Sequence, residues 1–147
     1  MTVHLVKLCV GCDTVKELAD WQVERLKWLG RERKRVELCH RTLQTPKRGD
    51  EILDGGSLYW VIKGFVLVRQ HIINLRPDTK DDGRACCGIL LDKELVTTRA
   101  QPRHAFQGWR YLEAADAPKD VKAYQGEDDE VPPRMREDLR ELRLIDW

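Results

Sequence analysis

Two cysteines separated by two residues, Cys9 and Cys12, form the sharpest local chemical pattern in the chain. A pair with this spacing can bind a metal ion or cycle between a dithiol and a disulfide. A structural zinc site needs a second pair of closely spaced ligands. Cys39-His40 and Cys86-Cys87 do not readily supply one, because adjacent side chains of a strand point to opposite faces. We therefore expect no tightly held metal and no cofactor, and the pattern leaves open a redox dithiol or small buried thiols.

Motifs of the common catalytic classes are missing from the sequence. It contains no nucleophile-elbow serine, no glycine-rich phosphate or dinucleotide loop and no HExxH zinc motif. The four histidines are scattered, and His104 stands out only because it follows Arg103 in a turn after Pro102. The residues therefore assign no catalytic role, and they leave open whether the protein is an enzyme.

The segment from Leu95 to Leu112 has no acidic residue, although the chain is otherwise rich in them. It carries arginines interleaved with aromatic side chains. Cations contact phosphate groups and aromatic rings stack on unpaired bases, so this composition is typical of an RNA-binding edge. The alternative is that Phe106 and Trp109 are core anchors and that the arginines are solvated.

A second basic cluster extends from Arg31 to Arg48, with only Glu32 and Glu37 as acidic residues. If this cluster shares a face with the first, the binding interpretation becomes stronger. The candidate nucleic-acid-binding residues of the two segments are Arg41, Lys47, Arg48, Arg99, Arg103, Trp109 and Arg110.

The N-terminal part of the chain predicts a strand followed by a helix. His4–Val10 is apolar and β-branched, and Gly11 ends it. Asp13 and Thr14 are good N-cap residues, and apolar side chains at helical spacing continue to Gly30. Trp21 and Trp28 share one flank of this helix, which indicates that they seal it against a sheet; the alternative is a base-stacking platform.

The middle of the chain predicts closely spaced strands that curl into a small antiparallel or mixed barrel. A turn is expected at Thr45–Asp50, a tight hairpin at Asp54–Gly56, a bulge at Gly64 and a polar loop at Pro77–Gly83. The expected strands are Val36–Leu43, Glu51–Leu53, Leu58–Ile62, Phe65–Ile73, Ala85–Leu91, Leu95–Thr98 and Trp109–Leu112. After a polar stretch from Glu113 to Val131, a second helix should begin at Pro132. The predicted class is α+β, with a helix near each end.

Length and composition indicate one cytoplasmic domain over residues 1–147. The 147 residues fit the usual size of a single domain, and a net charge of +1 provides no global attraction to polyanions. No apolar run approaches the roughly 20 residues of a membrane span, and the N-terminus does not resemble a signal peptide. Five cysteines, an odd number, argue against a secreted disulfide framework.

Three stretches carry a resemblance to a known family. These are Val3–Gly11, Tyr59–Gly64 and Ala105–Leu112. Over most of its length the chain resembles an alphaproteobacterial domain-of-unknown-function family, number 1489. This resemblance implies a bacterial source and supplies no activity.

A looser resemblance is to the PUA-like superfamily, in particular its ASCH branch. A basic turn leads to Gly49-Asp50 and a strand, and a second strand carries Lys63-Gly64 before a β-branched run and a polar loop. The resemblance implies a small barrel with a cleft that binds RNA or modified bases. The usual Lys-x-x-Glu-x-Arg element is incomplete, because Lys34 and Glu37 are followed by Cys39 in place of arginine. The resemblance therefore implies the binding role of that branch and not its catalysis.

These observations favour a module that binds RNA or a nucleotide-containing ligand. One alternative is a small hydrolase of RNA or of an acylated nucleoside, with Lys34 or Lys63 as the base and Glu37 as its partner. Another alternative is a protein-interaction module that uses the tryptophan-rich surface.

Overall fold

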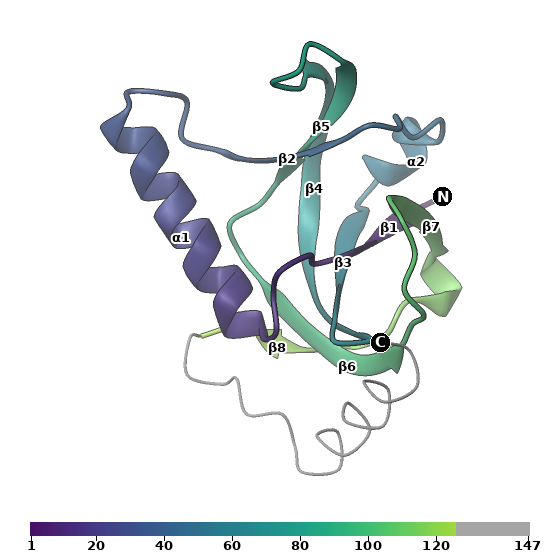
Figure 1. Ribbon diagram of the computed structural model, residues 1–147. Coiled ribbons are helices and arrows are strands. Elements are labelled where there is room, and N and C mark those ends of the chain that lie inside the picture. Colours follow the sequence, from purple (N-terminus) through teal and green to yellow (C-terminus); the bar gives the residue numbers. More distant parts are fainter. Residues whose placement is uncertain (126–147) are drawn as a thin grey trace.

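The computed structural model describes residues 1–125. These residues form eight strands and two α-helices, which confirms the α+β class (Figure 1). In chain order the elements are β1 (Val3–Leu8), α1 (Val15–Arg31), β2 (Leu38–Thr42), α2 (Gly49–Ile52), β3 (Ser57–Ile62), β4 (Phe65–Thr79), β5 (Ala85–Leu91), β6 (Val96–Pro102), β7 (Trp109–Glu113), the 3-10 turn η1 (Ala114–Asp116) and β8 (Asp120–Ala123).

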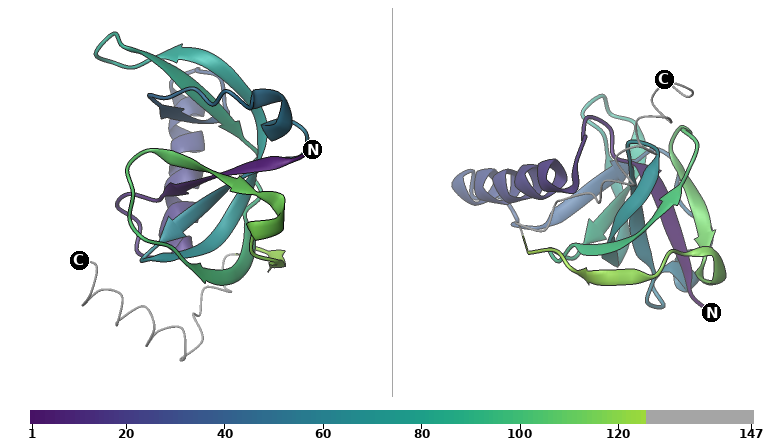
Figure 2. Two further views of the ribbon diagram at one scale, coloured as in Figure 1. Left: turned by 90° about the vertical axis from the view of Figure 1, so that its right-hand side faces the viewer. Right: turned by 90° about the horizontal axis from the view of Figure 1, so that it is seen from below.

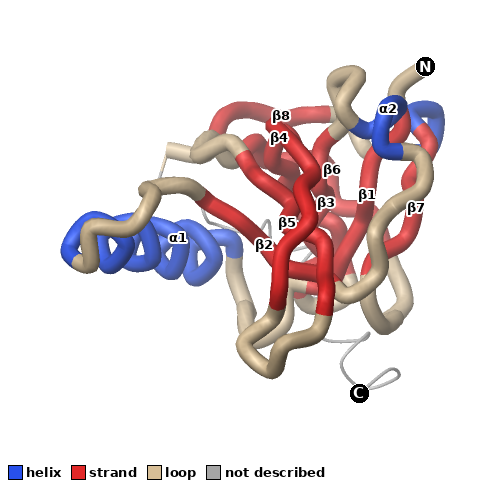
Figure 3. Tube along the Cα trace, turned by 90° about the horizontal axis from the view of Figure 1, so that it is seen from above, coloured by secondary structure: helices blue, strands red, loops and turns tan. Residues whose placement is uncertain are grey.

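Helix α1 begins where the predicted cap residues lie. The Thr14 hydroxyl accepts a hydrogen bond from the Glu17 N–H at 3.1 Å, and the Glu17 carboxylate accepts one from the Asp13 N–H at 3.0 Å. These two bonds occupy backbone donors that the first helical turn leaves free. Helices α1 and α2 lie at opposite ends of the view in Figure 3, and their buried residues Leu18 and Ile52 belong to the same hydrophobic cluster.

Strand β4 is shared between two parts of the mixed sheet. Its first half lies between β3 and β6, and its second half, from Ile72, pairs with β5. A register shift between Ile72 and Asn74 separates the two halves, as expected at a bulge that bends a strand. Strand β1 pairs in parallel with β3 and antiparallel with β7, which lies beside it in Figure 2.

The tight hairpin lies nine residues later than the sequence indicates. Lys63 and Gly64 join β3 to β4 with φ values of 54° and 84°, as in the two-residue turn that suits twisted strands. The predicted hairpin at Asp54–Gly56 is wrong, because that segment leads from α2 into β3, which runs parallel to β1. The predicted bulge at Gly64 is wrong because Gly64 lies in this turn, and the predicted strand at Glu51–Leu53 is wrong because α2 ends only at Ile52.

The sheet curls without closing. Its main path, β2-β5-β4-β3-β1-β7, begins at β2 and ends at β7, and within residues 1–125 these two strands do not pair. Closure into a barrel is therefore not confirmed. Strand β8, which pairs with β6, occupies part of the stretch predicted as a loop. The helix predicted from Pro132 lies outside the described residues.

Hydrophobic clusters cover both faces of the central strands. The larger cluster packs Leu5 and Trp60 against the inner face of α1, and the smaller one packs Val6 and Tyr59 below the β6–β7 connection. All six residues of β3 are buried, as expected for a strand covered on both faces. Among the described residues, no helix has the length and apolarity needed to cross a membrane.

Candidate functional site

A cavity of about 590 Å³ opens where β1 ends and α1 begins. Its walls also include β2 and one residue of β3, so four elements meet there. We call this cavity the cleft. The charged, polar, thiol and aromatic side chains that line it are Lys7, Cys9, Cys12, Glu17, Trp21, His40, Arg41 and Trp60.

His40 lines the cleft and carries a buried polar atom. Its ring lies edge-on to Trp60, with ring centroids 5.2 Å apart. Its Nε2 atom is buried and has no hydrogen-bond partner among the described residues. Burial lowers the pKa of His40 to about 4, and the charges of Lys7 and Lys80 act in the same direction. The imidazole is therefore neutral at pH 7 and can donate one hydrogen bond and accept one.

Trp60 is held in place by a fully buried amide network. The Trp60 indole N–H donates to Gln70 Oε1 at 2.9 Å. The Gln70 amide also exchanges hydrogen bonds with Gln22 of α1 and donates to the Asp92 carbonyl. Because Gln70 is completely buried, this network fixes α1, β3 and β4 against one another at the base of the cleft.

Two cationic side chains lie in the cleft wall. Lys7 is half-buried, and burial together with the neighbouring charge of Lys80 lowers its pKa. Arg41 donates hydrogen bonds to Asp78 at 3.1 Å and to Asp81 at 3.3 Å, which raise its pKa. A ligand with an anionic group would meet the positive charge of Lys7 on this side, because Asp78 and Asp81 balance the charge of Arg41.

Trp21 leaves a large aromatic surface open to solvent. Its side chain is 60% exposed, so the prediction that it seals α1 against the sheet is wrong. Trp28, seven residues later, is half-buried and is contacted by the cations of Arg25 and Lys34, each 4.8 Å from its ring centroid. The two tryptophans of α1 therefore have different surroundings, and only Trp21 lines the cleft.

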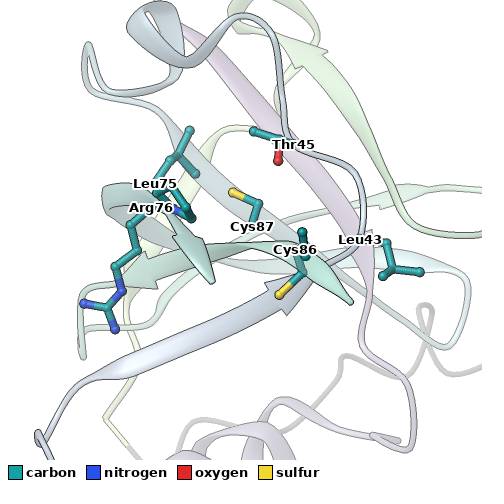
Figure 4. Close-up of a pocket in the computed structure, with 8 residues that line it drawn as sticks. Leu43, Thr45, Leu75, Arg76, Cys86 and Cys87 are labelled. Atoms are coloured by element: carbon teal, nitrogen blue, oxygen red, sulfur yellow. The ribbon is translucent and has the colours of Figure 1, made fainter. Parts of the chain in front are cut away.

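The five cysteines divide into two groups. Cys86 and Cys87 are buried, as the interpretation of small apolar thiols predicts, and they line a separate cavity of about 340 Å³ (Figure 4). Cys9, Cys12 and Cys39 are partly exposed. Residues 1–125 contain no group of three or more histidine, cysteine, aspartate or glutamate side chains placed to hold a metal ion.

The predicted basic residues near β2 have separate surroundings. Arg41 lines the cleft. The backbone N–H groups of Lys47 and Arg48 donate to the Tyr111 hydroxyl, at 2.9 and 3.2 Å. The Arg48 guanidinium binds Glu51 and Glu113, so it ties α2 to the end of β7.

The predicted residues of the second segment do not line the cleft, although Trp109 is paired with Lys7 in the β1–β7 register. Trp109 is 6% exposed and donates its indole N–H to the Gln44 carbonyl at 2.7 Å, so it is a core anchor and presents no ring face for a base. Arg110 projects from the opposite face of β7, over the Phe106 ring. Arg99 is exposed on β6, and Arg103 is tied through its N–H to Gly64. The structure does not gather the seven predicted residues into one surface.

The residues named for a hydrolase have separate partners. Lys34 stacks on Trp28, whereas Glu37 pairs with Arg76 and Arg35. Lys63 forms an ion pair with Asp13 at 2.7 Å. None of these contacts joins either lysine to Glu37 as a base and its partner.

Comparison with known protein families assigns the chain to a family. Residues 5–145 match the family model described as Protein of unknown function (DUF1489). The chain belongs to this family. The DUF1489 match includes the cleft and nearly the whole described fold. No curated protein and no solved structure matches the chain.

Sequence reasoning about this DUF1489 chain missed most of the cleft. Arg41 was predicted as a binding residue, and the Cys9–Cys12 spacing was recognised as a pattern. Lys7 was not predicted, and His40 was considered only as a metal ligand, because their relation depends on the parallel pairing of β1 with β3 and on the position of α1 beside β2. The one available signal was the alternative interpretation of the helix tryptophans as a base-stacking platform.

Proposed function

We propose that this protein binds RNA or a nucleotide-containing ligand, with one nucleotide unit seated in the cleft. The observation that carries the proposal concerns His40 of the cleft, whose buried Nε2 atom has no hydrogen-bond partner among the described residues. Such an atom costs a fold about 1–3 kcal/mol unless a ligand or water satisfies it.

The aromatic lining suits a base. Trp21 offers an exposed indole at the cleft, and stacking of a base on such a ring contributes about 1–3 kcal/mol. Neutral His40 can hydrogen-bond to a base edge, because it carries both a donor and an acceptor. Trp60, fixed by Gln70, keeps the imidazole in position.

The cationic lining suits a phosphate. Lys7 and Arg41 lie in the same cavity as the aromatic side chains, so one nucleotide could contact both kinds of group.

We also propose that the fold is a PUA-like curled barrel. The order strand, helix, strand before the central hairpin is consistent with it, as is the strong curl of the sheet (Figure 2).

A salt titration tests whether the cleft provides the phosphate contact. Replacing Lys7 with glutamine should weaken binding to fluorescently labelled single-stranded RNA and lower the slope of log affinity against log salt by about one unit. The matched control is Lys47→Gln, because Lys47 is an exposed lysine outside the cleft. A slope that falls for the Lys47 variant and not for the Lys7 variant would contradict the proposal, and so would no binding at low salt.

A further inference from the structure

The loop between β1 and α1 brings two thiols together. The Cys9 N–H donates to the Val61 carbonyl at 2.9 Å, which holds the start of the loop on β3. The Cys12 N–H then donates to the Cys9 carbonyl at 3.3 Å, so the backbone turns back on itself. Gly11 has a φ of 83°, in the left-handed region that glycine adopts without strain, and this conformation completes the turn.

Both side chains pack against the main hydrophobic cluster at this turn. Burial raises the pKa of the Cys9 thiol, and a hydrogen bond with Cys12 raises it further. Both thiols line the cleft and a second cavity of about 220 Å³ on the other side of the loop. A turn that closes Cys12 back onto the Cys9 carbonyl, with both thiols in the same two cavities, is compatible with a disulfide across a two-residue spacer.

A small reagent can reach the pair. Cys9 and Cys12 are both partly exposed, Val10 between them is 88% exposed, and the space beside Gly11 is empty to 4 Å. Cys86 and Cys87, by contrast, are buried within β5. The chain therefore has one accessible pair of adjacent thiols among its described residues.

We propose that Cys9 and Cys12 are a redox-active dithiol that exchanges with low-molecular-weight disulfides to form an intramolecular disulfide. Their placement in one tight turn, their shared cavities and their access to solvent carry this inference. It stands independently of nucleotide binding. Disulfides in reducing compartments are usually transient and serve catalysis or redox sensing, and an accessible pair with this spacing fits that class.

The reaction proceeds in two exchanges. The Cys12 thiolate attacks one sulfur of a disulfide such as oxidised glutathione, whose S–S bond breaks as one glutathione leaves and takes up a proton. Cys9 loses its proton and attacks the Cys12 sulfur, which forms the Cys9–Cys12 bond and releases the second glutathione. Two cysteine thiols thus lose two electrons and two protons, and one disulfide becomes two thiols. Cys12 attacks first because the pKa of Cys9 is raised.

Equilibration in glutathione redox buffers tests this assignment. The full chain is incubated anaerobically at a series of reduced-to-oxidised ratios, quenched in acid, alkylated and mapped by peptide mass spectrometry. Cys9 and Cys12 should lose reactivity together at one midpoint and be joined by a disulfide. The Cys9→Ser variant should stop at a mixed disulfide between Cys12 and glutathione, and the Cys39→Ser control should titrate as the parent does.

The parent protein alone can overturn the inference. If Cys9 and Cys12 both remain open to alkylation across the whole series, they are not a redox pair. A disulfide of the parent that involves Cys39, mapped in place of the Cys9–Cys12 bond, would assign the redox chemistry elsewhere. Both results are independent of whether the variants fold and of whether RNA binds.

Discussion

The surroundings of His40 control both the charge of its imidazole and the hydrogen bonds that it can form. The ring is wedged against Trp60 and faces two lysine charges, so the protonated form is disfavoured. Nε2 is nevertheless left without a partner among the described residues. A neutral imidazole with an unused hydrogen-bonding atom is suited to recognising a polar ligand edge that carries no charge of its own.

This environment predicts acid sensitivity with a defined sign. The folded pKa of about 4 lies below the unfolded value of 6.5, so the unfolded chain binds the proton more readily. Stability should therefore be complete above pH 6.5 and fall by about 3 kcal/mol as the pH drops to 4. Denaturant unfolding at several pH values measures this loss, which should be smaller in a His40→Asn variant.

The control for this experiment is His71→Asn, because His71 is an exposed histidine on β4. His4 contributes a loss of the same sign, since burial also lowers its pKa, so some acid sensitivity should persist in the His40 variant. If the His40→Asn protein loses as much stability between pH 6.5 and 4 as the parent, His40 takes up no additional proton on unfolding, which would contradict a lowered pKa in the folded state.

At the scale of elements, local sequence patterns predicted where helices and strands lie, whereas the pairing of distant strands determined how they are connected in the sheet. The cap residues and apolar periodicity before Gly30 predicted α1, and the β-branched run at Leu58–Ile62 predicted β3. The hairpin was misplaced because Asp54-Gly55 is a stronger turn signal than Lys63-Gly64. Only the parallel pairing of β3 with β1 shows that a crossover, and not a hairpin, precedes β3.

The crossover into β3 requires glycine at position 56, because the backbone passes close to other backbone atoms there. A Cβ atom there would clash with the Ile52 carbonyl and lie 2.5 Å from the Val3 carbonyl oxygen. Because both obstacles are backbone atoms, Gly56→Ala should lower the free energy of unfolding by about 2–3 kcal/mol. Chemical denaturation measures the change.

Gly30 offers a matched control for the same substitution. It lies in α1 with no atom within 4 Å of an added Cβ, so Gly30→Ala should raise stability by about 0.5–1 kcal/mol. Equal effects at the two glycines would show that the close approach at Gly56 does not constrain the fold.

For the whole molecule, the net charge of +1 means that any attraction to a polyanion must be local. The sequence identified arginines and aromatics by composition, but composition does not show which face each side chain occupies. In the structure Trp109 is in the core, Arg48 ties α2 to β7, and Arg41 lies in the cleft. The cleft is therefore the place in the described fold where exposed aromatic, neutral polar and cationic groups meet.

The most direct measurement of this claim compares the two tryptophans of α1. Affinity for a labelled single-stranded RNA is measured for Trp21→Ala and Trp28→Ala, with thermal unfolding to confirm that both variants are folded. Trp21→Ala should cost about 1–3 kcal/mol of binding, whereas Trp28→Ala should bind as the parent does, because Trp28 is not part of the cleft. A folded Trp21→Ala protein that binds RNA with the parent's affinity would contradict the assignment of the cleft as the nucleotide site.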